Sequence, residues 1–435
     1  MNYTYKQIWL INYPVMMSIL MEQLINITDA VFLGHVGEVE LGASALAGVY
    51  YMAIYILGFG FSLGLQVMIA RRNGEQQYEK TGRTFFQGLF FLGGLAVTLI
   101  FISALVSPPL LKHFIRSPQI YQAVVDYLDW RCFGLLFSFP FLAFRSFYVG
   151  ITKTTVLTLA AIIAVLINIP CNYLLIFTFD LGISGAAMAS SFAEAGSLLI
   201  VIIYTLYKTD KEKYGLKAVY DRKLLKAVLH LSKWSMMHSF VSVAPWFLFF
   251  IAIERLGEVQ LAVSNITRSV STIFFVIVNS LGATTASLVS NLIGKGKSDQ
   301  LFPLCRKILK LGYAIGLPLI ALAMLLNRQI IGCYTDNPLL TGIAFTPFIV
   351  MLLNYIFAVP GYVYISALSG TGDTRTAFIF QATTIAVYLI YLYLLSYCFT
   401  VPLAVYLTAE YVFVTMLGIQ SYLYLKRKHN FVPLQ

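Results

Sequence analysis

The sequence contains one unit twice. The stretch GEVELGAS at 37–44 returns as GEVQLAVS at 257–264, an offset of 220 residues. The same offset relates Gly74 to Gly294, and after a shorter loop in the second half it becomes 216. A chain that repeats itself at about half its length folds as two copies of one structural unit. The positions at which the copies differ are therefore the most informative.

Long apolar runs fill both copies. Hydrophobic residues make up 59% of the 435 residues and charged residues 11%. A helix needs about 20 mostly apolar residues to cross a bilayer, whereas a lipid-facing barrel would show segments of about ten residues with alternating polarity. The continuous runs predict an all-α membrane protein with twelve transmembrane helices in two six-helix lobes related by a parallel internal repeat. The predicted spans are 9–33, 47–70, 84–107, 122–147, 156–178, 182–207, 229–253, 268–290, 307–327, 340–368, 376–399 and 401–425.

Basic residues mark one side of the membrane. Most of the 30 Lys and Arg residues lie near the termini and in the loops that follow even-numbered spans, so the net charge of +11 indicates membrane topology and not a nucleic-acid partner. By the positive-inside rule, both termini are cytoplasmic. We expect an N-terminal lobe at 1–207, a cytoplasmic linker at 208–228 and a C-terminal lobe at 229–435. The tail of the linker is either a short helix on the anionic leaflet or a solvated connector.

Several classes of protein lack their sequence signatures here. The chain has no G-x-x-x-x-G-K-[ST] loop and no soluble region large enough for an ATPase, so the energy must come from an ion gradient or from a partner. It also has no HExxH or GxSxG motif, and its five cysteines form no CxxC pair. We therefore expect neither an enzyme nor a cofactor beyond a coupling ion.

Carboxylates inside predicted spans are costly and therefore mark candidate sites. Glu22, Asn26 and Asp29 follow i, i+4, i+7 spacing, which places them on one face of helix 1. The two carboxylates are roughly 10 Å apart along the helix axis. That distance is too long to share one ion directly but short enough to pass a proton or cation through Asn26 or water.

Helices 5 and 6 add polar residues at the spacing of one helical turn. The predicted ion-coupling residues are Asp29, Glu22, Asn26, Asn168, Asn172, Ser190 and Glu194, with a possible Na⁺ at Asp29. The alternative for each buried Asn or Ser is an interhelical hydrogen bond that holds the bundle together. A buried carboxylate stabilises a bundle poorly, but a proton or Na⁺ can neutralise it, which makes Asp29 the best candidate for a switch.

The second copy has lost the carboxylates and the amide of helix 1. The residues at the corresponding positions are Ser242, Trp246 and Phe249. Aromatic residues suit the wall of a cavity for flat organic molecules, although lipid-facing or core positions explain them equally. The predicted substrate cavity comprises Trp246, Phe249, His238 and Glu410. Because Glu410 matches Glu194 at the offset of 216, a scaffold role shared by both copies stays open.

Two further charged clusters favour structural roles. Asp126, Asp129 and Arg131 begin helix 4, where neighbouring opposite charges can pair at the membrane interface. Asp373, in the loop GTGDTRT, is placed to cap the following helix and stabilise its amino terminus.

Two long motifs resemble a known family. TDAVFLGHVGEVELGASALAG at 28–48 and ALSGTGDTRTAF at 367–378 are similar to the multidrug and toxic compound extrusion (MATE) transporters, nearest to the prokaryotic DinF-like branch. The resemblance implies a Na⁺- or H⁺-driven antiporter that exports cationic or amphipathic organic compounds by alternating access. It also implies a multi-pass protein of the bacterial inner membrane, in contact with membrane lipids, and we expect a monomer.

The resemblance also implies roles for individual residues. Asp29 matches the family's helix 1 acid, Asn168 its helix 5 asparagine and Ser190 its helix 6 hydroxyl position. Asn172 departs from the family pattern, because many prokaryotic members have aspartate there. Two glutamates, Glu22 and Glu194, supply carboxylates nearby, so the identity of the coupling ion does not carry over.

Three other functions are weighed against export. A lipid-linked precursor flippase should have a strongly cationic cavity, but Arg145 is the main basic residue inside a span. A membrane-embedded lipid-modifying enzyme could use Glu194 and Glu410 as acid and base. A major-facilitator transporter also has two six-helix halves, but the loop after helix 2 fits its signature poorly.

Overall fold

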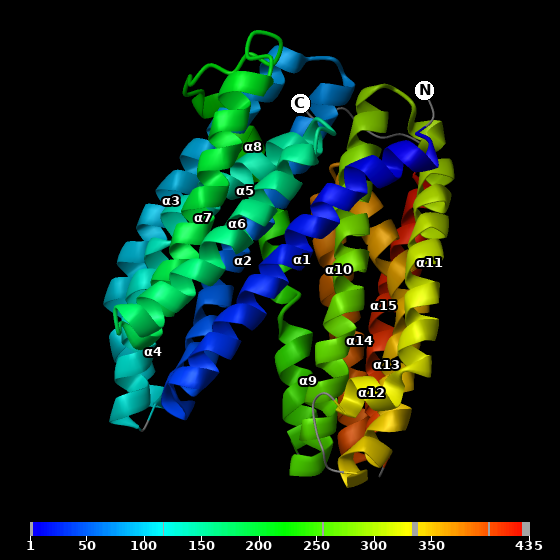
Figure 1. The fold of residues 1–435 in the computed structure, drawn as a ribbon. Helices are drawn as coiled ribbons and strands as arrows, with labels where there is room; N and C mark the ends of the chain where they lie inside the picture. Colours follow the sequence, from blue (N-terminus) through cyan, green and yellow to red (C-terminus); the bar gives the residue numbers. More distant parts are fainter. Residues whose placement is uncertain (1–2, 116, 255, 333–337, 399–400, 429–435) are drawn as a thin grey trace. The chain divides into compact units, whose positions relative to one another are not determined.

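The structure, a computed structural model, divides the chain into two compact units. It describes residues 3–115, 117–254, 256–332, 338–398 and 401–428. Within these residues all regular secondary structure is helical. Residues 13–236 form one unit, here the N unit, and the described residues of 1–12 and 237–434 form the other, the C unit. The helices of each unit run side by side (Figure 1).

The helices of the first half are long and apolar, as the sequence predicts. Their bounds are α1 (Tyr5–Val36), α2 (Glu38–Gly74), α3 (Tyr78–Phe114), α4 (Pro118–Phe133), α5 (Leu135–Gly150), α6 (Thr155–Tyr173), the π-helical turn η1 (Leu174–Thr178) and α7 (Gly182–Lys208). The pair α4 and α5 is bent by 43° across Gly134 and together corresponds to the predicted span 122–147.

The second half repeats this order. Its elements are α8 (Arg222–Val241), α9 (Ala244–Glu254), α10 (Glu258–Gly294), the 3₁₀ turn η2 (Ser298–Gln300), α11 (Leu301–Leu325), α12 (Asn327–Gly332), α13 (Pro338–Gly370), α14 (Thr374–Tyr397) and α15 (Leu403–Arg427). The predicted continuous span 229–253 is wrong in one respect, because a turn at Ser242 and Val243 separates α8 from α9. Pro245 explains why a helix restarts there, since proline is favoured in the first turn of a helix.

Spanning helices dominate the described residues. Ten helices are long and apolar enough to cross a membrane, and the bent pair α4 and α5 raises the number to eleven. The twelfth predicted span is the one divided between α8 and α9. The protein is therefore an all-α, multi-pass membrane protein.

The repeated motif that reveals the duplication marks the start of a helix and not an outer loop. α2 begins directly after Gly37, and α10 begins directly after Gly257. Gly257 has a φ of 99°, in the region that favours glycine, so this residue permits the tight entry into α10. The predicted spans at 47–70 and 268–290 consequently start about three turns after the helices begin.

The first turns of α1 pack in the C unit, although the rest of that helix belongs to the N unit. The hydroxyl of Thr284, on α10, donates a 3.0 Å hydrogen bond to Oδ1 of Asn12. Lys307, on α11, donates a 2.9 Å hydrogen bond to the carbonyl oxygen of Tyr3. These contacts hold the beginning of the chain against helices of the second copy.

The linker lies docked against α3 of the N unit. It has no helix at 209–221, and α8 begins at Arg222. The backbone N–H of Gly82 donates a 3.0 Å hydrogen bond to the carbonyl of Tyr214, and the backbone N–H of Asp221 donates one of 3.0 Å to Oε1 of Gln87. The side chain of Tyr214 is buried. The linker is therefore docked against α3 as far as Asp221, and its tail is helical from Arg222.

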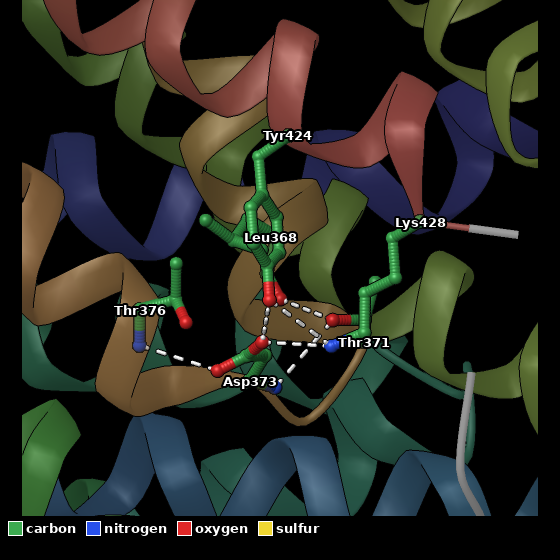
Figure 2. Close-up of polar contacts among 6 residues, drawn as sticks. All are labelled: Leu368, Thr371, Asp373, Thr376, Tyr424 and Lys428. Atoms are coloured by element: carbon green, nitrogen blue, oxygen red, sulfur yellow. Dashed lines mark hydrogen bonds and ion pairs between the residues drawn. The ribbon is translucent and has the colours of Figure 1, made fainter. Parts of the chain in front are cut away.

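Asp373 caps α14 and binds the end of α15 within the C unit (Figure 2). Its Oδ1 accepts a 3.2 Å hydrogen bond from the backbone of Thr376, as the sequence predicts. Its Oδ2 accepts 2.7 Å hydrogen bonds from the hydroxyl of Tyr424 and from Nζ of Lys428. Burial alone would raise the pKa of Asp373, but these donors and the charge of Lys428 lower it from 3.8 to about 2.

Replacing Gly82 by alanine should release the linker from α3. The added Cβ would overlap the carbonyl oxygen of Tyr214, so the hydrogen bond between these two residues cannot form. We expect trypsin to cut the exposed lysines of the linker about tenfold faster, because cleavage follows the population of the open form. The cleavage sites to monitor are Lys211, Lys213 and Lys217.

The same helix offers a matched control for this test. A Cβ at Gly93, also on α3, meets no atom within 4 Å. The Gly93→Ala variant should keep the wild-type rate of cleavage. Equal rates in both variants would show that the docking of the linker does not depend on the contact at Gly82.

Replacing Asp373 by asparagine should destabilise the protein in a pH-dependent way. A carboxylate whose pKa falls on folding adds stability above its unfolded pKa of 3.8, and that stability is lost as pH falls towards about 2. We expect the wild type to exceed Asp373→Asn by about 1–3 kcal/mol at neutral pH, and the difference in melting temperature to shrink below pH 3.8. The exposed Asp299 on η2 provides the control, since Asp299→Asn should melt with the wild type at every pH. A difference for Asp373→Asn that is independent of pH would contradict the ion-pair explanation.

Candidate functional site

Asp29 is the centre of a polar cluster inside the N unit. Its side chain lies on α1 and is 7% exposed. Its Oδ1 accepts hydrogen bonds from the amide nitrogens of Asn168, at 3.0 Å, and Asn172, at 2.6 Å. Its Oδ2 accepts a short hydrogen bond from the hydroxyl of Ser190. Among the described residues Asp29 forms no ion pair, so three neutral donors take the place of water around its carboxylate.

The geometry of α6 and α7 brings these donors together. Asn168 and Asn172 are one helical turn apart on α6, and the amide nitrogen of Asn172 also donates to Oδ1 of Asn168 at 3.1 Å. The π-helical turn η1 follows immediately, a local distortion that is frequent at functional sites. Gly185, near the start of α7, lets that helix approach η1, because a Cβ there would lie 2.8 Å from the backbone of Leu175.

The other two residues of the helix 1 stripe lie apart from this cluster. Glu22 and Asn26 are exposed, and the described residues show no hydrogen bond from either to Asp29. Glu22 lies within electrostatic reach of Arg145 and Arg131. Asp29 therefore contacts side chains of α6 and α7. Glu22 and Asn26, the other two polar residues on its face of α1, are not part of that cluster.

Glu194 forms an ion pair on the same unit. Its Oε1 accepts a 2.7 Å hydrogen bond from Nη1 of Arg131, whose guanidinium lies 4.1 Å from the centre of the Tyr51 ring. The side chains of Arg131 and Glu194 are 13% and 21% exposed. The expected pairing of Arg131 with Asp129 is wrong, because Arg131 on α4 reaches across to α7. The contact joins residues 63 positions apart, so helical spacing gave no signal for it.

The predicted substrate residues of the second copy fall into two places in the C unit. Phe249 on α9 is fully buried, and Arg268 lies with its guanidinium carbon 4.9 Å from the ring centre. Arg268 also pairs with Glu410, at 3.7 Å between Nη1 and Oε1. His238 on α8 is hydrogen-bonded instead to Gln381 on α14. The side chain of Trp246 lies outside the described residues.

Arg268 is the residue that sequence reasoning missed. It is the first residue of the predicted span 268–290, a position that hydropathy assigns to the membrane boundary. The structure places it inside α10 with 4% of its side chain exposed. α10 begins at Glu258, ahead of the predicted span. A prediction of that start would have placed Arg268 inside the helix bundle.

The chain has matches among known proteins. A family model described as MatE matches residues 14–174 and 235–394, one stretch in each copy of the repeat. The chain belongs to the MatE family. MatE proteins are membrane transporters, so this chain is a transporter and not an enzyme. The predicted family and the predicted all-α, two-lobe fold are confirmed.

Relatives in bacteria cover most of the chain. It is 23% identical over 381 residues to a probable multidrug resistance protein NorM of Shewanella oneidensis, which covers 84% of this chain and 81% of that protein. It is 24% identical over 386 residues to the probable NorM of Photorhabdus laumondii, with 86% and 83% covered.

Solved structures share the fold over nearly the whole chain. An outward-facing multidrug resistance MATE family transporter of the MOP superfamily matches with a TM-score of 0.90 at 19% identity, covering 97% of this chain and 95% of that one. A MOP superfamily transporter from Pyrococcus furiosus matches with a TM-score of 0.88 at 18% identity, with the same coverage. At these identities the likeness concerns the fold alone.

Replacing Glu194 by glutamine should strongly destabilise the MatE protein. The substitution leaves the guanidinium of Arg131 without its counter-ion in a largely dry site, a change that costs about 3–5 kcal/mol. The double variant Arg131→Gln with Glu194→Gln should recover much of this loss, because no unpaired charge remains. Denaturation in detergent micelles measures the free energies of unfolding of the wild type, of each single variant, Arg131→Gln and Glu194→Gln, and of the double variant.

An exposed ion pair on the same unit serves as the control. Arg83 and Glu79 pair on α3 with side chains 52% and 67% exposed. Exposed pairs contribute at most about 1 kcal/mol, so Glu79→Gln should leave stability nearly unchanged. If the double variant of the Arg131 pair is as unstable as the sum of its single variants, the two residues are not coupled.

Proposed function

We propose that this MatE chain is a cation-coupled antiporter that exports organic, cationic or amphipathic compounds by alternating access. The observation that carries the proposal is Asp29, a buried carboxylate held by three neutral donors. We further propose that it works as a monomer in the bacterial inner membrane, surrounded by lipids, with both termini cytoplasmic. The names of the relatives from Shewanella and Photorhabdus, probable multidrug resistance proteins, support the class of substrate.

The hydrogen bonds around Asp29 supply a mechanism for coupling. A charged carboxylate only accepts hydrogen bonds, and Asn168, Asn172 and Ser190 all donate to it. Once protonated, Asp29 carries a donor of its own and accepts less well, so at least one of these hydrogen bonds must be lost or reversed. The protonated and charged forms therefore favour different arrangements of α6 and α7. Such a difference in affinity between two states is what an ion needs in order to drive a conformational change.

Sodium can use the same oxygens after a small rearrangement. Hard cations bind to carboxylate, amide and hydroxyl oxygens, and Asp29, Asn168, Asn172 and Ser190 offer all three kinds. The two amide nitrogens that face Asp29 would have to rotate so that their oxygens point inward. The described residues contain no group of three or more His, Cys, Asp or Glu side chains that could hold a metal ion. Sodium would therefore be held mainly by neutral oxygens around one carboxylate.

The buried arginines argue against a flippase for lipid-linked precursors. A pyrophosphate needs several cations that are free to converge on it. Arg131 is paired with Glu194, and Arg268 is paired with Glu410. Arg145 lies with its guanidinium 5.5 Å from the Phe59 ring and within electrostatic reach of Glu22. Each of these arginines has a carboxylate nearby, which suits a cationic cargo better than an anionic one.

The decisive experiment is efflux from proteoliposomes under an imposed pH gradient or an imposed Na⁺ gradient. Asp29→Asn removes the titratable group but keeps the size of the side chain, so we expect ion-driven efflux of a fluorescent organic cation to fall to background under either gradient. The gradient that drives the wild type identifies the coupling ion. Undiminished efflux by a folded Asp29→Asn variant would falsify the assignment.

A second carboxylate of the N unit provides the control. Asp126 on α4 accepts a 2.8 Å hydrogen bond from Gln122 at the exposed surface. Because Asp126 is hydrogen-bonded to Gln122 and is not among the groups that contact Asp29, Asp126→Asn should transport at the wild-type rate. Equal losses in both variants would indicate a general effect of removing charge.

A further inference from the structure

The last part of the linker runs along α3 towards the middle of that helix. Near the start of the docked segment, the carbonyl of Tyr214 contacts the backbone of Gly82. At its end, the ring of Tyr220 lies 6.4 Å from that of Phe90. At a rise of 1.5 Å per residue, Gly82 and Phe90 are about 12 Å apart along the helix axis. Because Phe90 lies inside the predicted membrane span 84–107, the linker reaches the level of the membrane interface before α8 begins.

The side chain of Gln87 holds the linker at this depth. Its Nε2 donates a 2.7 Å hydrogen bond to the carbonyl of Val219, and its Oε1 accepts one of 3.0 Å from the backbone N–H of Asp221. Gln87 is fully buried on α3. The carboxylate of Asp221 accepts a 3.1 Å hydrogen bond from the backbone N–H of Leu224, in the first turn of α8. The segment between Val219 and α8 therefore has a fixed position on α3.

This fixed segment exposes apolar and aromatic side chains. Val219 is 54% exposed and Tyr220 is 61% exposed, and the neighbouring Phe90 is exposed as well. Such a group of side chains is unfavourable in water. At the boundary of a membrane it is favourable, because apolar side chains enter the lipid and tyrosine rings are enriched at the level of the headgroups. The exposed side chains of the linker therefore continue the lipid-facing surface of α3.

Basic side chains flank these residues. Lys217 precedes them, and Arg222 and Lys223 follow them, all three exposed. In the part of the chain that the structure describes, none of the three forms an ion pair. The aliphatic stems of lysine and arginine can cover apolar surface while their charged ends reach the headgroups, where they attract anionic lipids. We call the following residues the linker anchor: Lys217, Val219, Tyr220, Arg222 and Lys223.

We propose that the linker anchor lies in the membrane interface and binds the phosphate groups of anionic phospholipids. Val219 and Tyr220 contact the lipid, while the basic residues on either side supply positive charge at the level of the headgroups. The inference goes beyond the proposed function, because it depends on the docked linker and on neither the coupling ion nor the cargo. Anionic lipid thereby stabilises the docked position of the segment that joins the two copies of the repeat.

The test is the quenching of Tyr220→Trp fluorescence by brominated phospholipids in nanodiscs that hold the full chain. Bromine quenches tryptophan only at short range, so the signal reports which lipids lie beside position 220. The chain has four tryptophans of its own, and the quenching of the wild type is therefore subtracted. We expect brominated phosphatidylglycerol to quench at about a tenfold lower mole fraction than brominated phosphatidylcholine, because two or three basic residues attract the anionic headgroup.

Replacing the basic residues should remove the preference for the anionic lipid and keep the contact with lipid. With Arg222→Gln and Lys223→Gln added to the reporter variant, both brominated lipids should quench at similar mole fractions. The matched control removes two adjacent exposed basic residues from the last turn of α15, Lys426 and Arg427. Lys426→Gln with Arg427→Gln should keep the preference, because neither residue belongs to the linker anchor.

Three results overturn the proposal. Absence of quenching by both brominated lipids shows that position 220 faces water. Equal losses of preference in the two charge variants show a general attraction by the net charge of the chain, +11. Loss of the preference on adding inorganic phosphate at constant ionic strength assigns the basic residues to a soluble anion. If Tyr220→Trp does not fold, Val219→Trp serves as the reporter with the same expected results.

The outcome is separable from that of the proposed function. Quenching is measured without an ion gradient and without an organic substrate, so failure of the antiporter assignment leaves this result intact. If efflux depends on Asp29 while position 220 shows no preference for anionic lipid, only the proposal for the linker anchor fails.

Discussion

The cost of removing a charge from water governs this structure. Every acidic side chain that the helices bury must be compensated locally, since a bare carboxylate in a dry site is strongly unfavourable. The chain uses two solutions. Asp29 is surrounded by three neutral donors, whereas Glu194 and Glu410 each face an arginine. The first solution leaves a carboxylate that can gain a proton or an ion, and the second fixes the charge within the protein.

The internal repeat shows how these solutions diverged on one backbone. At the offset of 216, Asn168 and Asn172 of α6 correspond to Thr384 and Tyr388 of α14. In the N unit these positions donate to an aspartate on α1, while in the C unit Tyr388 donates to Glu410 on α15. The same helix positions thus serve polar networks in both units, but the acid they serve lies on a different helix.

The sequence was a good guide to what depends on local composition. Continuous apolar runs predicted the spanning helices, and the one-turn spacing of polar residues on helices 5 and 6 predicted groups that the structure brings to Asp29. Contacts between distant residues left no such pattern. The partner of Arg131 is 63 residues away, and Arg268 reaches Glu410 from another helix. The burial of Arg268 also required the true start of α10, because hydropathy marks the membrane core and not the longer helix that passes through it.

The docking of the linker was hidden for a related reason. Its composition is that of a solvated segment, but its backbone forms hydrogen bonds with the backbone of Gly82 and with the side chain of Gln87, both on α3. The only local trace was a glycine at position 82, whose missing Cβ makes room for the carbonyl of Tyr214. Glycines are common in helices, so Gly82 alone could not indicate that the linker docks there.

The packing of the first turns of α1 in the C unit has a consequence for synthesis. The hydrogen bond between Asn12 and Thr284 joins residues 272 positions apart in the chain. The one between Tyr3 and Lys307 joins residues 304 positions apart. At rates of about 5–20 residues per second, the start of the chain waits roughly tens of seconds for these partners to leave the ribosome. Although the gene carries one unit twice, the first copy cannot reach its final structure until the second has been inserted. The residues that are synthesised first are therefore among the last to reach their final contacts.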